Sequence, residues 1–122
     1  RTLVQGLKDL KVLDGSVDGL IEEQAYRPYY MHGTSHWLGL DVHDSGPYRD
    51  ADRATELQSG MVFTIEPGLY FGTQATESPS HLQGIGIRIE DDVLVTNAGH
   101  RVLSASIPSE IDDIENLVGQ GF

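Results

Sequence analysis

Residues 30–44 combine three histidines with two glycines, and this combination argues against a continuous helix through the stretch. The histidines are His32, His36 and His43, and the glycines are Gly33 and Gly39. Glycine in a helix interior costs about 1 kcal/mol relative to alanine, and threonine and valine are also poor helix formers. We therefore predict short extended segments joined by a bend at Gly39. Without that bend, one straight strand would send His36 and His43 to opposite faces.

The common histidine motifs do not account for this stretch. The zinc-peptidase motif H-E-x-x-H requires a glutamate at the position of Gly33, and the H-x-D start of the iron oxygenase triad does not occur here. Histidine is the commonest metal ligand and the usual proton carrier near neutral pH. Each of the three could equally be an ordinary hydrogen-bonded histidine, so the stretch alone leaves both interpretations open.

The composition restricts the kind of site and the kind of partner. The 122 residues contain no cysteine, so any bound metal must be held by imidazole and oxygen ligands. A net charge of −11 argues against a nucleic-acid-binding surface, which needs clustered lysine and arginine. No apolar stretch reaches the length of a membrane span, and the first residues do not resemble a signal peptide. We expect one domain at most, in the cytoplasm, with no membrane partner.

The segments on either side predict two helices followed by several strands. The spacing of leucines in residues 1–13 favours a helix, and Ser16 is placed to cap a second helix that runs to about Tyr26. The first helix lacks an N-cap signal, so we expect the sequence to have been cut from a longer chain. Further along we predict strands at residues 60–66, 84–95 and 102–106, surface loops at 46–53 and 72–83, and a helix or solvated end in the acidic tail.

The two longer predicted strands each carry a carboxylate on their polar face. In the first, Thr64 and Glu66 share that face, and Glu66 precedes a Pro-Gly turn, where a carboxylate is either in solvent or committed to a partner. In the second, Arg88 and Glu90 share one face, and a surface ion pair worth roughly 0–1 kcal/mol would give the same pattern. The opposite face of the second strand is predicted to be buried through Ile85, Ile87 and Ile89.

One imidazole and two carboxylates together make a hard, oxygen-rich ligand set. Such a set suits manganese or another first-row divalent ion more than a structural zinc. Hydrolytic sites often use paired metal ions, bridging carboxylates and a bridging hydroxide as the nucleophile. The spacing of the residues does not select a substrate.

Three segments together resemble a known enzyme family. They read HGTSHWLGLDVHD at residues 32–44, GMVFTIEPGLY at 60–70 and GIGIRIEDD at 84–92. In order and spacing they resemble the aminopeptidase P (Xaa-Pro aminopeptidase) family, which belongs with prolidase and methionine aminopeptidase to the pita-bread metallopeptidases. The resemblance implies an α+β fold, in which residues 1–122 are the C-terminal half of a pita-bread catalytic domain, with two N-terminal helices followed by antiparallel strands. It also implies a metal-dependent exopeptidase that releases the residue preceding proline by attack of a metal-bridging hydroxide.

The resemblance assigns metal ligands residue by residue. His36 and Glu66 would ligate one divalent ion, and Glu90 would bridge it to a second. Manganese is the ion that the resemblance favours, with cobalt and zinc as alternatives. Glu66 is also the candidate for moving the proton of the attacking water.

The resemblance also assigns residues to the substrate. His32 and His43 would line the substrate pocket, with Tyr70 close by, and His43 would hydrogen-bond the scissile carbonyl or the developing oxyanion. Arg88 would orient its neighbours, so the expected catalytic set is His32, His43, Glu66 and Arg88. The partner would be a peptide with an Xaa-Pro N-terminus, and the resemblance leaves open whether the parent enzyme is a homo-oligomer.

The sequence also departs from the family pattern. The family's site needs five ligands, and two of them are aspartates upstream of the point where this sequence begins. The aspartates present here lie in the predicted helices, in turns or beside the histidines. We therefore expect the isolated chain to hold three ligands of five, to bind at most one ion, and to be inactive.

Three other interpretations stay open beside this one. The parent could be a prolidase, which cleaves Xaa-Pro dipeptides and differs in only a few residues of these segments. It could be a pita-bread relative that only binds peptides or proteins, although such relatives usually lose the ligands. It could also be an unrelated small β-rich metal protein that is complete at this length.

Overall fold

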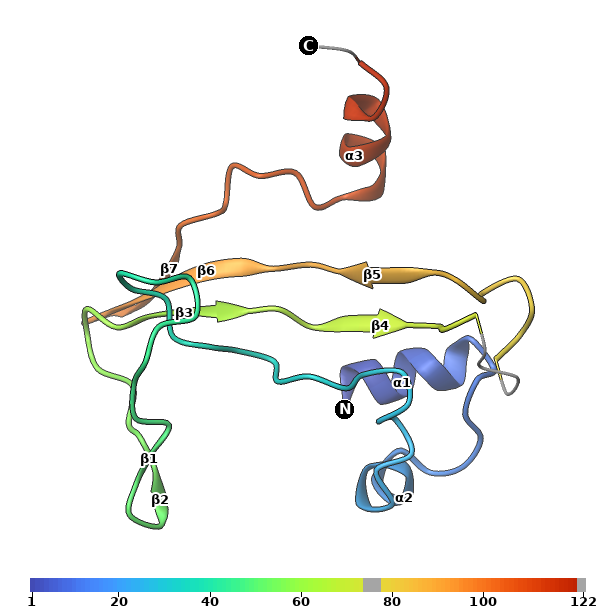
Figure 1. Ribbon diagram of the computed structural model, residues 1–122, viewed down its shortest axis with the longest axis horizontal. Coiled ribbons are helices and arrows are strands. Elements are labelled where there is room, and N and C mark those ends of the chain that lie inside the picture. Colours follow the sequence, from blue (N-terminus) through green and yellow to red (C-terminus); the bar gives the residue numbers. More distant parts are fainter. Residues whose placement is uncertain (74–77, 121–122) are drawn as a thin grey trace. The chain divides into compact units, whose positions relative to one another are not determined.

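The computed structural model describes residues 1–73 and 78–120, and all of its paired strands are antiparallel (Figure 1). Its elements are α1 (Thr2–Asp9), α2 (Val17–Glu22), β1 (Arg49–Asp50), β2 (Arg53–Ala54), β3 (Val62–Ile65), β4 (Gly68–Tyr70), β5 (Gly86–Arg88), β6 (Asp91–Thr96), β7 (Gly99–Val102) and α3 (Ile111–Leu117). The predicted order of two N-terminal helices followed by strands is confirmed. No helix in these ranges is long and apolar enough to cross a membrane.

The chain divides into two compact units, and the first contains α1, α2, β4 and β5. Its core is formed by Leu7 of α1 together with Tyr29 and Phe71, all of which are buried. The predicted cap of α2 is confirmed, because the Gly19 N–H donates to Oγ of Ser16 at 3.1 Å. Both helices are shorter than predicted, since α1 ends at Asp9 and α2 at Glu22.

The second unit is built on a three-stranded sheet in the order β3-β6-β7. Residues 34–38 run antiparallel along the other edge of β3. Three backbone hydrogen bonds hold them there: from Glu66 to Thr34 at 2.7 Å, from Thr64 to His36 at 2.9 Å, and from Leu38 to Val62 at 3.1 Å. This extended segment, followed by a bend at residues 39–43, confirms the predicted bend at Gly39.

Several boundary predictions are wrong. The loop predicted at residues 46–53 contains a short hairpin, β1–β2, and the strand predicted at 102–106 lies earlier, as β7. Residues 74–77 of the loop predicted at 72–83 lie outside the described residues. The isoleucines predicted to be buried are exposed, because within the described ranges no segment covers them: Ile85 by 41%, Ile87 by 63% and Ile89 by 47%.

Candidate metal centre

Strand register brings three potential metal ligands to one face of the second unit. The segment at residues 34–38 pairs with β3 so that His36 lies opposite Thr64. On the other side of β3, one step beyond its last pair with β6, Glu66 falls opposite Glu90. Side chains two residues apart on a strand share a face, so Thr64 and Glu66 point the same way. The sequence thus places one histidine and two glutamates around the end of β3.

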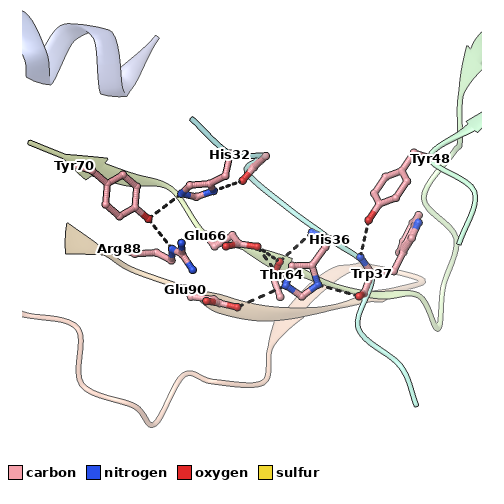
Figure 2. A network of polar contacts seen from close by, with 10 residues as sticks. His32, His36, Trp37, Tyr48, Thr64, Glu66, Tyr70, Arg88 and Glu90 are labelled. Atoms are coloured by element: carbon pink, nitrogen blue, oxygen red, sulfur yellow. Dashed lines mark hydrogen bonds and ion pairs between the residues drawn. The ribbon is translucent and has the colours of Figure 1, made fainter. Parts of the chain in front are cut away.

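The side chains of His36, Glu66 and Glu90 converge, as Figure 2 shows. Nε2 of His36 lies 3.3 Å from Oε1 of Glu66 and 4.0 Å from Oε1 of Glu90. One potential ligand atom from each residue lies within 4.8 Å of the others. Glu66 is buried and Glu90 is exposed, so the cluster has a buried end and an open end. Among the described residues, this is the group of three that could hold a metal ion.

The hydrogen bond of the His36 ring is compatible with a cation in this cluster. Nδ1 of His36 lies 3.0 Å from the carbonyl oxygen of Trp37. A carbonyl only accepts, so this contact assigns the proton of the neutral imidazole to Nδ1 and leaves a lone pair on Nε2. Nε2 therefore faces two carboxylates as a third acceptor. Three acceptor atoms grouped in this way suit a cation between them, and imidazole with carboxylate oxygen is a donor set that divalent first-row ions accept.

Thr64 links two of these residues, and the sequence did not single it out. Its Oγ1 accepts a hydrogen bond from the His36 N–H at 3.0 Å and donates to Oε1 of Glu66 at 3.2 Å. The residue is only 1% exposed. The available signal was its position two residues before Glu66, on the same face of the strand.

His43 lies beside the cluster without being part of it. Its ring is T-shaped against the ring of His36, with the centroids 4.4 Å apart. The loop that carries it is closed by Asp44, whose N–H donates to the Trp37 carbonyl at 3.0 Å and whose Oδ2 accepts from the Leu40 N–H at 3.0 Å. His43 is exposed, so its ring is available to a bound molecule.

The other three predicted site residues form a hydrogen-bonded chain within the first unit (Figure 2). Nε of Arg88 donates to Oη of Tyr70 at 2.7 Å, and Oη of Tyr70 lies 2.8 Å from Nε2 of His32. Nδ1 of His32 lies 2.7 Å from the Gly33 carbonyl, which can only accept, so in the neutral ring Nε2 accepts the Tyr70 proton. The pairing of β4 with β5 positions two of these three residues, because it sets Tyr70 opposite Gly86 and Arg88 opposite Gly68.

Comparison with known proteins points to one family of enzymes. Residues 3–97 match metallopeptidase family M24. The Xaa-Pro aminopeptidase of Haemophilus influenzae is 54% identical over 118 residues, which cover 97% of this chain and 27% of that protein. Zinc-substituted aminopeptidase P of Escherichia coli in complex with product has a TM-score of 0.86 and 51% identity, over 93% of this chain and 26% of its own. The aminopeptidase PepP of Pseudomonas aeruginosa has a TM-score of 0.89 and 45% identity, with the same two coverages.

These matches support the predicted fold and show how much of each relative this chain covers. The likeness to the aminopeptidase P structures confirms the prediction of an α+β, pita-bread architecture. The chain spans about a quarter of the length of the curated relatives it matches.

Proposed function

Because the chain belongs to metallopeptidase family M24, we propose that it forms the C-terminal half of the catalytic domain of a metal-dependent Xaa-Pro aminopeptidase. The parent protein would release the N-terminal residue from peptides that have proline in second position. The observation that carries the proposal is the convergence of His36, Glu66 and Glu90, three acceptor side chains that fit a divalent cation. The names of the similar proteins support the choice of substrate.

The three acceptors would hold part of a two-ion centre. His36, Glu66 and Glu90 would hold the ions as ligands, with the remaining ligands supplied by other parts of the parent chain. Manganese suits this oxygen-rich set, and cobalt or zinc are the alternatives. When bound, such ions would activate a water molecule as the nucleophile and polarise the peptide carbonyl.

The chain's own residues would bind the substrate and move protons. The Glu66 carboxylate would take the proton of the attacking water and deliver it to the leaving amine. His43, exposed beside His36, would donate a hydrogen bond to the oxygen that gains charge. His32 and Tyr70 would contact the peptide, and Arg88 would hold the Tyr70 hydroxyl in place through the bond that it donates.

The substrate assignment is tested with peptides on the full-length protein that contains this chain. After loading with Mn2+, it should release the first residue from a tripeptide with proline second. The same tripeptide with alanine second is the matched control and should be cleaved far more slowly. Free amino acid is measured by mass spectrometry. Preference for an Xaa-Pro dipeptide would instead indicate a prolidase, and metal binding without cleavage of either peptide would indicate a binding module.

Replacing His43 should affect the reaction without emptying the metal centre. We expect His43→Ala to lower kcat/KM for the tripeptide by about 10²-fold, since a hydrogen bond to developing charge contributes ~3 kcal/mol. Metal content, measured on the same sample, should stay unchanged. His100→Ala is the control, because His100 is an exposed histidine on β7 of the same sheet. Unchanged kcat/KM in His43→Ala would remove His43 from the catalytic set.

A further inference from the structure

We propose that Thr64 is a positioning residue of the metal centre, whose hydroxyl group fixes the Glu66 carboxylate relative to the backbone of His36 before a cation binds. The inference rests on the proposed function, because it takes His36 and Glu66 as metal ligands. Its evidence is a pair of hydrogen bonds, from the His36 N–H to Oγ1 at 3.0 Å and from Oγ1 to Oε1 of Glu66 at 3.2 Å (Figure 2).

The direction of these two bonds follows from the groups involved. A backbone N–H can only donate, so Oγ1 of Thr64 must be the acceptor in its contact with His36. The single hydroxyl proton is then free for the Glu66 carboxylate, which accepts. The Thr64 N–H also donates to the His36 carbonyl at 2.9 Å. Thr64 and His36 are therefore tied by two bonds, and the Glu66 carboxylate is bonded to that pair.

Because Thr64 is buried, its hydroxyl group can be assigned to the site and not to the stability of the strand. The residue is 1% exposed in the middle of β3, where a β-branched side chain packs well. Valine would give the same branching without placing a polar oxygen in a buried position, which costs free energy unless the oxygen is hydrogen-bonded. Both partners of this oxygen belong to ligand residues. The hydroxyl is thus explained by the two ligands that it connects, because strand formation does not require it.

A carboxylate that is already held in its binding orientation should bind a cation more tightly than one that is free to rotate. The Glu66 side chain has several rotatable bonds, and orienting it opposes metal binding unless the orientation already exists. Groups that hydrogen-bond metal ligands typically change metal affinity by about 10–100-fold when they are removed. Loss of the Thr64 hydroxyl should therefore appear in the affinity for the metal, whether or not substrate is present.

The experiment measures Mn2+ binding to the metal-free, full-length protein by calorimetry. Thr64→Val should raise the Kd by about 10–100-fold, while Thr64→Ser, which keeps the hydroxyl, should stay within about 3-fold of wild type. Thr96→Val is the matched control, because Thr96 ends β6 of the same sheet and its register partner is Gly99 at the turn. Thermal unfolding of each variant reports whether the sheet is intact.

The outcomes separate this inference from the proposed function. Thr64→Ala, which removes the hydroxyl without placing a methyl group against the His36 N–H, should weaken binding in the same way and replaces Thr64→Val if that variant does not fold. If His36→Ala abolishes binding while the Thr64 variants bind like wild type, this inference alone is overturned. This inference alone is also overturned if Thr64→Ser binds Mn2+ as weakly as Thr64→Val, because the serine keeps the hydroxyl. A wild-type protein that binds no Mn2+ overturns the proposed function as well.

Discussion

His36→Ala in the full-length protein that contains this chain is expected to lose bound metal and to lower kcat by on the order of 10³-fold or more, because a catalytic ion supplies several kcal/mol of transition-state stabilisation. The effect follows from the geometry of the cluster. Nε2 of His36 lies 3.3 Å from the Glu66 carboxylate and 4.0 Å from that of Glu90. Alanine removes the neutral ligand and leaves two carboxylates side by side. Metal content is measured by mass spectrometry of the dialysed protein, and kcat with a tripeptide that has proline second.

The control for this variant is a histidine outside the cluster. His81 is exposed in a loop of the first unit, so His81→Ala should keep both the metal and the rate. The metal content of His36→Ala also shows why the rate falls. Loss of a metal ligand would lower kcat together with the metal content, whereas loss of a catalytic group that binds no metal would lower kcat with the ions still in place. Retention of two ions and of the wild-type rate would show that the ligand assignment is wrong.

The bend between His36 and His43 could be predicted because it depends on local chemistry. Glycines at 33 and 39 disfavour a helix, and period-two alternation then requires a bend if His36 and His43 are to meet. The structure has that bend, and the two rings are 4.4 Å apart. Local propensity was enough to predict the bend, whereas the stretch alone left open whether the two histidines serve one site.

The meeting of the two glutamates could not be predicted from spacing alone. Glu66 and Glu90 are 24 positions apart in the sequence, and they face each other only through the register of β3 with β6. The prediction joined residues 84–95 as one resumed strand. The structure separates them, since β5 pairs with β4 and β6 pairs with β3. Only the resemblance to a known family supplied this long-range pairing in advance.

Thr64 shows a second limit of the sequence. Its place on the same face as Glu66 was predicted, yet a threonine in a strand is common and carries no sign of its partners. Its two hydrogen bonds depend on the segment at residues 34–38 lying along β3. Ile85, Ile87 and Ile89 show a different limit. The alternation of apolar and polar residues predicts that they share a face, but it does not predict whether another segment covers that face.

The 122-residue chain alone is expected to show no measurable Xaa-Pro cleavage. Within the described residues, one cluster of three ligands is present, which is too few to coordinate a pair of ions. Without cations, Glu66 and Glu90 repel each other in a chain whose net charge is −11. The purified chain should therefore bind at most one Mn2+, and weakly. Binding is measured by calorimetry, and cleavage with the same tripeptide as for the full-length protein.

The matched control restores the missing ligands without changing this chain. The remainder of the parent protein, expressed separately and mixed in, should increase both Mn2+ binding and cleavage, because it would supply the other ligands and cover exposed apolar residues such as Ile87 and Ile111. A chelator should abolish any activity recovered in the mixture. Cleavage by the chain alone that a chelator abolishes would mean that His36, Glu66 and Glu90 suffice for catalysis. The active centre would then be a smaller one, complete within the second unit.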